Sequence, residues 1–272
     1  MILALVLAVA VGVSLGLLGG GGSILTLPIL VYALGMEAKQ AIATSLLVVG
    51  VTSAAAMVPH ARAGRVNVRI GLAFGAASMA GAFVGGRLAH FIPSAVLLVS
   101  FAIMMLVTGL AMLRRRAVAP FVARGPRPWG RILVVGVAIG LLTGVIGAGG
   151  GFVIVPALML LCGLSMPEAV ATSLLVIALN SFSGFAGFVG HVTLDLRVAA
   201  LFTLAAVIGS VGGAFAVNRV PGDVLRRAFA WLVLAMAVFM LWRQTSAVWG
   251  MAALVVIISA AWLVRPRMIE AS

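Results

Sequence analysis

Charged residues are scarce in this chain. Only 8% of its 272 residues are charged and five are acidic, whereas soluble domains carry roughly 25% charged residues. Hydrophobic residues make up 64% of the chain and the mean hydropathy is +1.30. The composition excludes an ordinary soluble domain. Because the apolar runs are about 17–23 residues long and do not alternate in polarity, we expect an all-α polytopic membrane protein.

Cysteine and the common catalytic motifs are also missing. A single cysteine, Cys162, excludes an intrachain disulfide and a thiolate cluster for zinc or iron–sulfur binding. The sequence has no HExxH, GxSxG or GKS/T motif. No carboxylate lies in the middle of an apolar run, where proton and cation pathways usually place one. We therefore expect no enzyme activity, no metal site and no cofactor. His60, His90 and His191 lie near the expected helix ends, which favours interfacial positions.

The net charge of +13 comes almost entirely from arginine, with Lys39 as the one lysine. The arginines lie in short gaps between apolar runs, which is typical of residues that orient a membrane protein and contact anionic lipid headgroups. We expect membrane lipids as partners and a second copy of the chain as a candidate partner. Nucleic acid is not expected.

An internal repeat organises the chain. The stretch 12–101 aligns without a gap with 140–229, at an offset of 128 residues. Because chance matches of Leu, Ala and Val are common, the shared glycine, proline and polar positions carry the alignment. They are Gly19, Gly21, Gly22, Pro28, Gly35, Thr44, Ser45, Ser53, Arg69, Gly81, Gly85 and Pro93, matched by Gly147, Gly149, Gly150, Pro156, Gly163, Thr172, Ser173, Ser181, Arg197, Gly209, Gly213 and Pro221. Long apolar repeats interrupted by glycine at matching places predict a secondary transporter.

The repeats predict four segments. Repeat 1 spans 1–113, a basic cytoplasmic linker 114–131 and repeat 2 132–242, and 243–272 forms an extra C-terminal transmembrane helix with a tail. Each repeat contains a short apolar run after a glycine cluster. A run of 11 residues reaches only about 16 Å, half of the ~30 Å hydrocarbon layer.

The short runs allow two topologies. If each continues the preceding helix as one broken crossing, the repeats are parallel. If each folds back at its glycines as a hairpin, three further crossings follow and the repeats are inverted. With the linker inside, the inverted arrangement puts 14 basic residues inside and four outside, against 11 and seven for the parallel one. The positive-inside rule therefore favours inverted repeats, with the N-terminus outside and the C-terminus inside.

The two glycine clusters are the strongest candidates for a binding site. Glycine is poor in helix interiors, and each cluster opens a short helix whose first N–H groups and dipole favour an anion. The residues we assign are Gly20, Gly21, Gly22 and Ser23, with Gly149, Gly150 and Gly151 in the second repeat. Close helix packing through small residues is the structural alternative. That packing is the interpretation we prefer for Gly81-xxx-Gly85 and Gly209-xxx-Gly213.

Hydroxyl side chains follow each cluster. Thr44 and Ser45, and their equivalents Thr172 and Ser173, lie within the next helix and offer donors at membrane depth. Asn180 adds an amide in the second repeat, where the first repeat has Thr52. The alternative is that these hydroxyls bond back to carbonyls of their own helix.

The run from Gly16 to Ser23 with Ala-Thr-Ser-Leu-Leu downstream, and its copy in the second half, resembles the TauE/SafE sulfite exporter family, also called the toluene sulfonate uptake permease family. The resemblance covers both repeats, up to about Trp242. It implies a multi-pass protein of the cell inner membrane that moves sulfite, sulfonates or related small sulfur anions, often outward. It implies no soluble cofactor and no catalytic residues.

The leading hypothesis is a secondary transporter that works by alternating access between the two repeats. An anion channel is one alternative and would show no coupling. A membrane sulfur-relay or assembly protein is another, although Cys162 has no cysteine at the equivalent position, Leu34, of the first repeat.

The topology is testable by cysteine labelling in a chain that lacks Cys162. We expect Ala123→Cys and Gly222→Cys to react only from the cytoplasmic face, and Ser94→Cys and Ser246→Cys only from outside, because the arginines hold the linker and the start of the last repeat helix inside. Outside labelling at Gly222 would contradict the inverted arrangement.

Overall fold

The computed structural model describes residues 2–18, 21–114, 129–146, 150–216 and 222–244. These residues form ten α-helices and a π-helical turn, Ile29–Ala33, that continues the second helix. The helices are α1 (Ile2–Leu18), α2 (Gly21–Pro28), α3 (Ala38–Arg62), α4 (Val68–Ala89), α5 (Ser94–Arg114), α6 (Trp129–Ile146), α7 (Gly151–Cys162), α8 (Met166–Phe188), α9 (Leu196–Ala216) and α10 (Gly222–Gln244). The all-α expectation is confirmed for this part of the chain.

A break in the helix was expected at both glycine clusters, and the structure describes it at the second one, just before α7. Residues 19–20, between α1 and α2, and 147–149, between α6 and α7, lie outside the described residues. Gly150, at the start of α7, has φ +72°, a left-handed conformation that favours glycine. The short helices also end alike, because Gly35 and Gly163 follow them with φ +68° and +67°. Pro28 explains the wider turn after α2, since a proline inside a helix removes a hydrogen bond and crowds the preceding turn.

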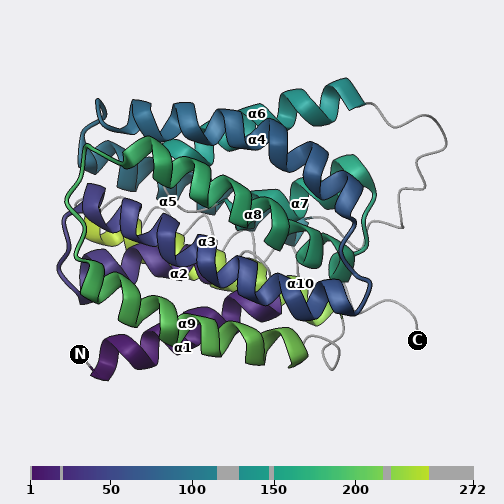
Figure 1. The fold of residues 1–272 in the computed structure, drawn as a ribbon, viewed down its shortest axis with the longest axis horizontal. Coiled ribbons are helices and arrows are strands. Elements are labelled where there is room, and N and C mark those ends of the chain that lie inside the picture. Colours follow the sequence, from purple (N-terminus) through teal and green to yellow (C-terminus); the bar gives the residue numbers. More distant parts are fainter. Residues whose placement is uncertain (1, 19–20, 115–128, 147–149, 217–221, 245–272) are drawn as a thin grey trace, which may run out of the picture.

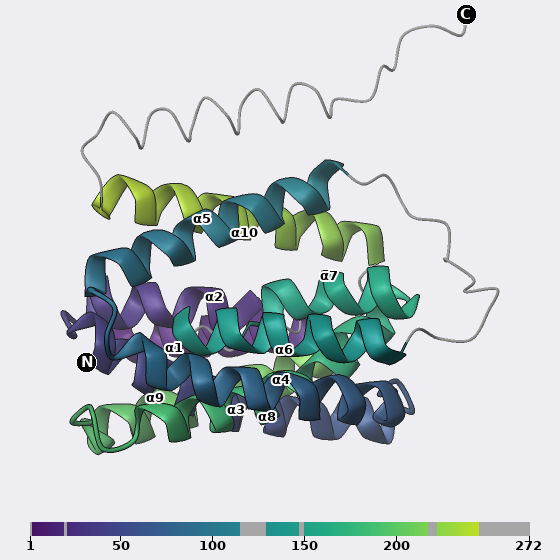
Figure 2. The ribbon, with the colours of Figure 1, turned by 90° about the horizontal axis from the view of Figure 1, so that it is seen from above.

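The helices lie side by side along one direction, in the layers that Figures 1 and 2 show together. In Figure 1, α4 and α6 occupy one edge, α1 and α9 the opposite edge, and α3 and α8 the centre. In Figure 2, α5 and α10 form an outer layer on one side of the short helices α2 and α7, and α3 and α8 lie on the other side. Other helices therefore cover the central pair α3 and α8 at both edges and on the face towards α2 and α7. Only the opposite face of the pair lies at the surface of the bundle.

Glycines bring the backbones of the edge helices into contact. A Cβ built at Gly81 or Gly85 of α4 would overlap the carbonyl oxygens of Val137 and Leu141 in α6. The same holds, shifted by 128 residues, at Gly209 and Gly213 of α9, which meet the carbonyl oxygens of Val9 and Val13 in α1. Close-packed helix crossings were expected at these four glycines, and the contacts confirm them.

Contacts between helix ends show which ends lie together. Lys39 Nζ, at the start of α3, donates to the carbonyl oxygen of His90 after α4 at 2.7 Å. The ring of His90 lies 4.8 Å from that of His191, after α8. At the opposite end, the guanidinium of Arg69 lies over the ring of Trp129, 5.3 Å from its centre, where α4 and α6 begin. Because α4 and α8 end together, they run in the same direction.

Six described helices are long and apolar enough to cross a membrane. They are Ala38–Arg62, Val68–Ala89, Trp129–Ile146, Met166–Phe188, Leu196–Phe215 and Arg227–Gln244. Large apolar side chains are exposed on the outer helices, such as Val134 and Ile208 at 70% and 72%. This is the surface that lipid would cover, so the multi-pass membrane assignment is confirmed.

Two expected segments lie largely outside the described residues. The extra C-terminal helix, expected within 243–272, is described only as far as Gln244, the last residue of α10. Of the linker 114–131, the structure describes only the two ends. These ends are helical: Arg114 closes α5, and Trp129 to Arg131 form the first turn of α6. The helix α6 therefore begins three residues before position 132, the expected start of repeat 2.

The glycine contacts predict a position-specific stability effect in α9. Gly209→Ala should lower the free energy of unfolding by roughly 1–3 kcal/mol, the usual cost of overpacking, because its Cβ would meet the α1 backbone. Gly212→Ala is the matched control, since nothing lies within 4 Å of its Cβ position. That change should be neutral or stabilising by about 0.5–1 kcal/mol. Thermal unfolding of the purified variants measures both, and equal melting temperatures would contradict the packing role.

Candidate functional site

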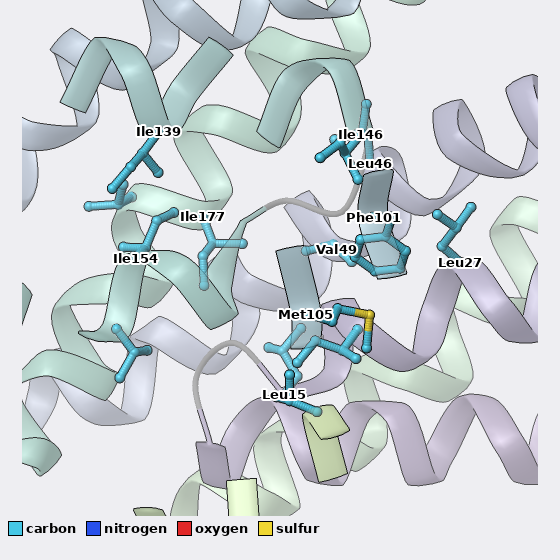
Figure 3. Close-up of a cluster of buried hydrophobic side chains, with 14 of the residues drawn as sticks. Leu15, Leu27, Leu46, Val49, Phe101, Met105, Ile139, Ile146, Ile154 and Ile177 are labelled. Carbon is cyan, nitrogen blue, oxygen red and sulfur yellow. The ribbon is translucent and has the colours of Figure 1, made fainter. Parts of the chain in front are cut away.

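Four helices carry the predicted site residues, and they meet at the centre of the bundle. The short helices α2 and α7 contact each other, α2 contacts α3, α7 contacts α8, and α3 packs against α8. Figure 3 shows the buried apolar side chains of this region, among them Val49 of α3, Ile177 of α8 and Ile154 of α7. The structure therefore brings together the elements that the sequence assigned to one site.

The glycines are only partly described. Gly20 and Gly149 lie outside the described residues, so their backbone roles stay predictions. Gly21 and Gly22 form the first turn of α2, with the buried Ser23 directly after them. Gly150 and Gly151 open α7, where the carbonyl of Gly150 accepts from the N–H groups of Val153 and Ile154 at 2.9 Å.

The starts of α2 and α7 have the chemistry of an anion site. The first N–H groups of any helix lack partners within it, and the aligned peptide dipoles leave a partial positive charge there. No Asp, Glu, Lys or Arg is fully buried among the side chains whose burial the structure describes. This environment favours a negative ligand and offers no full positive charge to bind it.

The predicted hydroxyls behave differently in the two halves. Thr44 Oγ1 and Ser45 Oγ in α3 are buried and have no hydrogen-bond partner. Their equivalents in α8 are occupied: Thr172 Oγ1 accepts from the backbone N–H of Asn67 at 3.0 Å, and Ser173 Oγ donates to the carbonyl of Val170 at 2.8 Å. The first half therefore presents two free hydroxyls where the second half uses them within the protein.

Asn180 combines a fixed amide oxygen with a free amide nitrogen. Its Oδ1 accepts a hydrogen bond from Ser78 of α4 at 2.6 Å, and its side chain is 1% exposed. Its Nδ2 has no partner. A buried amide nitrogen without an acceptor costs free energy, so its two N–H groups are suited to a ligand.

Two further serines belong with this set, and sequence reasoning did not assign them to the site. Ser53 of α3 and Ser181 of α8 are both fully buried, and neither Oγ has a hydrogen-bond partner among the residues that the structure describes. They are equivalent under the 128-residue offset, and each lies eight residues after Ser45 or Ser173. Their recurrence at the 128-residue offset could have identified these two serines from the sequence. The sequence could not show that their hydroxyls are unpaired.

Most other hydroxyls in these helices do bond back to their own backbone. The ones that donate to a carbonyl three or four residues earlier are Thr52, Ser78, Thr108, Thr143, Ser173, Thr203 and Ser210. Back-bonding is the ordinary fate of Ser and Thr inside a helix. Four buried hydroxyls, Thr44, Ser45, Ser53 and Ser181, have no hydrogen-bond partner in the part of the chain that the structure describes, and all lie on α3 and α8. Thr172 also departs from back-bonding, because its Oγ1 accepts from Asn67.

His60, expected at an interfacial position near a helix end, lies in the last turn of α3 and is fully buried. Its Nε2 lies 3.3 Å from the carbonyl oxygen of Gly16 near the end of α1. Its position near the end of an apolar run gave no sign of this, because burial depends on how α1 packs against α3.

Comparisons with known proteins identify a family. The family model described as "Sulfite exporter TauE/SafE" matches residues 4–240. A "Probable membrane transporter protein" of Xylella fastidiosa is 33% identical over 86% of this chain and 92% of its own length. The "Probable membrane transporter protein YdhB" of Bacillus subtilis is 28% identical over 80% of this chain and 90% of its own length. No solved structure matches the chain.

The start of α7 depends on a glycine at position 150. Gly150→Ala should lower the free energy of unfolding by more than the ~1–2 kcal/mol that a left-handed alanine costs, because its Cβ would overlap the Thr143 side chain. Thr143 cannot easily yield, since its hydroxyl bonds to the carbonyl of Gly140. Gly35 has a similar φ, and nothing lies within 4 Å of its Cβ position. Gly35→Ala should therefore show the conformational cost alone. Thermal unfolding compares the two, and a Gly150 effect no larger than that of Gly35 would refute the steric role.

Proposed function

Because this chain belongs to the sulfite exporter TauE/SafE family, we propose that it is a secondary transporter that exports a small sulfur oxyanion, such as sulfite, or an organosulfonate across the cell inner membrane. Family membership makes it a membrane transporter rather than an enzyme. The observation that carries the substrate class is the set of unpaired, buried donors on α3 and α8, which contact the short helices α2 and α7, in a core with no buried carboxylate among the described residues.

The chemistry of the donors suits a sulfo group. Hydroxyls and amide N–H groups donate hydrogen bonds, and helix N-termini favour negative charge. A sulfite or sulfonate headgroup carries three acceptor oxygens and one or two negative charges. The printed description of the matching family, sulfite exporter, agrees with this class of ligand.

We further propose that the two halves are inverted repeats, each with a glycine-broken hairpin followed by three long helices. The recurrence of the α4–α6 glycine contacts in α1–α9, at an offset of 128 residues, supports this arrangement. So does the pairing of helix ends. A parallel arrangement puts His90 and His191 on opposite faces of the membrane, whereas their rings lie 4.8 Å apart.

The packing changes how alternating access would work. We expected one repeat to move against the other, but the tightest contacts join helices of different repeats: α1 with α9, and α4 with α6. Backbones in such close contact move together. The moving bodies we propose are therefore built on the two edge pairs, α1 with α9 and α4 with α6, and backbone contacts at Gly86 and Gly187 join α8 to the second of them.

Neither alternative function gains a supporting observation. A sulfur relay needs an accessible thiol, and Cys162 is buried in α7. A channel conducts ions through a continuous pore without a conformational cycle. In this protein, closely packed edge pairs lie on both sides of one central set of donors. This arrangement suits a site that is exposed to each face in turn better than it suits a continuous pore.

Flux in proteoliposomes tests the function. With sulfite, sulfate, thiosulfate and an organosulfonate offered separately, we expect saturable uptake of at least one sulfur anion, accelerated by the same anion on the opposite side. Empty liposomes and chloride serve as controls. Non-saturating flux without this acceleration would indicate a channel, and absence of flux for all four anions would refute the substrate class.

A further inference from the structure

The central pair of helices presents a row of hydroxyls along one face in each half. Ser45, Val49 and Ser53 of α3 are spaced by four residues and therefore share a face, as do Ser173, Ile177 and Ser181 of α8. Figure 3 shows Val49 and Ile177 among the buried side chains between these helices and the short helix α7. The serines of each row therefore lie on the inner faces of α3 and α8.

The packing of α3 against α8 brings Ser53 and Ser181 to similar positions along the helix axes. The Cβ position of Gly50 lies 3.1 Å from the ring of Phe182, and that of Gly184 lies 3.5 Å from the side chain of Leu46. The helices are thus antiparallel. Counted from the contact of 50 with 182, Ser53 and Ser181 are offset by about 3 Å along the helices, and counted from the contact of 46 with 184 they are offset by about 6 Å, so they lie within about one helical turn of each other.

We propose that the transported anion binds at the crossing of α3 and α8, where Ser53 Oγ, Ser181 Oγ and Asn180 Nδ2 donate hydrogen bonds to it. This inference rests on the proposed function, because it names where the same substrate is held. Helices pack with axes roughly 8–10 Å apart, a span that one small oxyanion bridges with a hydrogen bond from each side.

The state of each donor supports this position. All three residues are at most 1% exposed and all three donor atoms lack partners. The one proton of Ser78 Oγ lies within reach of both the Gly75 carbonyl oxygen at 3.1 Å and the Asn180 amide oxygen at 2.6 Å, so Ser78 contacts the amide on its oxygen side. A buried donor that does not bond back to its helix costs free energy unless a ligand satisfies it.

The location also fits the proposed movement. Ser53 and Ser181 are equivalent in the two halves and come from the pair at the centre of the bundle, between the moving edge pairs (Figure 1). Ser53 comes from the first half, and Ser181 and Asn180 come from the second, so the site joins the two central helices.

The neutral donors define the charge of the substrate. The cost of moving an ion out of water rises steeply with its charge, and this crossing offers no buried arginine or lysine among the described residues to offset it. The site is therefore selective for a singly charged anion. A comparison of methanesulfonate with sulfate tests selectivity for charge separately from selectivity for shape, because the two anions are nearly the same size and differ by one charge.

Binding to the purified full chain, measured by calorimetry, tests the site. We expect wild-type protein to bind methanesulfonate at least tenfold more tightly than sulfate. Ser53→Ala and Ser181→Ala should each weaken methanesulfonate binding by about tenfold or more, the usual effect of removing a hydrogen bond to a charged group. Thr52→Val is the matched control: it is adjacent on α3, but its hydroxyl already bonds to the carbonyl of Val48 at 2.7 Å, so binding should be unchanged.

The outcomes separate this inference from the proposed function. If wild-type protein transports and binds a sulfur anion while both serine variants, confirmed folded by their melting temperatures, bind it like Thr52→Val, the crossing is not the site. Binding of sulfate as tight as that of methanesulfonate overturns the charge selectivity. If wild-type protein binds and transports no sulfur anion, the proposed function itself fails.

Discussion

The contact of bare helix backbones at the two edges of the bundle is the constraint on which this structure depends. In lipid, apolar side chains gain little by leaving the tails for one another, so helices associate through close packing and buried hydrogen bonds. Gly81 and Gly85 of α4, and Gly209 and Gly213 of α9, let the facing carbonyl groups approach to where a Cβ would stand. These contacts join α4 to α6 and α1 to α9 along much of their length.

The edge pairs leave α3 and α8 to form a polar centre. Both helices are mostly buried, and among the described residues they carry four buried hydroxyls without a hydrogen-bond partner, Thr44, Ser45, Ser53 and Ser181. Such groups destabilise a membrane protein unless something pairs with them. Because many other hydroxyls of the bundle are satisfied within their helix, the unpaired ones mark a specific place rather than a general tolerance of polarity. This is the physical basis for assigning ligand binding to the centre.

The two halves share geometry but not chemistry. Thr44 and Ser45 are free where Thr172 and Ser173 are occupied, and Asn180 stands where the first half has Thr52. Ser53 and Ser181 are the buried pair that is both equivalent and free in each half. Residues that recur at the 128-residue offset therefore share similar positions, and differences at individual positions set which donors are left unpaired. One anion with three acceptor oxygens has no need of a fully symmetric site.

The sequence alone determined the class of protein, the positions of its helices and the glycine interruptions, because lipid demands long apolar helices and glycine weakens them wherever it occurs. The repeat was also visible, since glycine, proline and serine recur at a constant offset. The sequence could not determine which hydroxyls are free. Thr44 and Thr172 are identical in type and setting along the chain, yet only Thr172 meets a backbone N–H, that of Asn67. Burial of His60 against Gly16, and the joining of helices across the repeats, likewise follow from contacts between distant segments. Those contacts arise only when the helices pack, so the tertiary structure alone decided where this protein has donors left for a ligand.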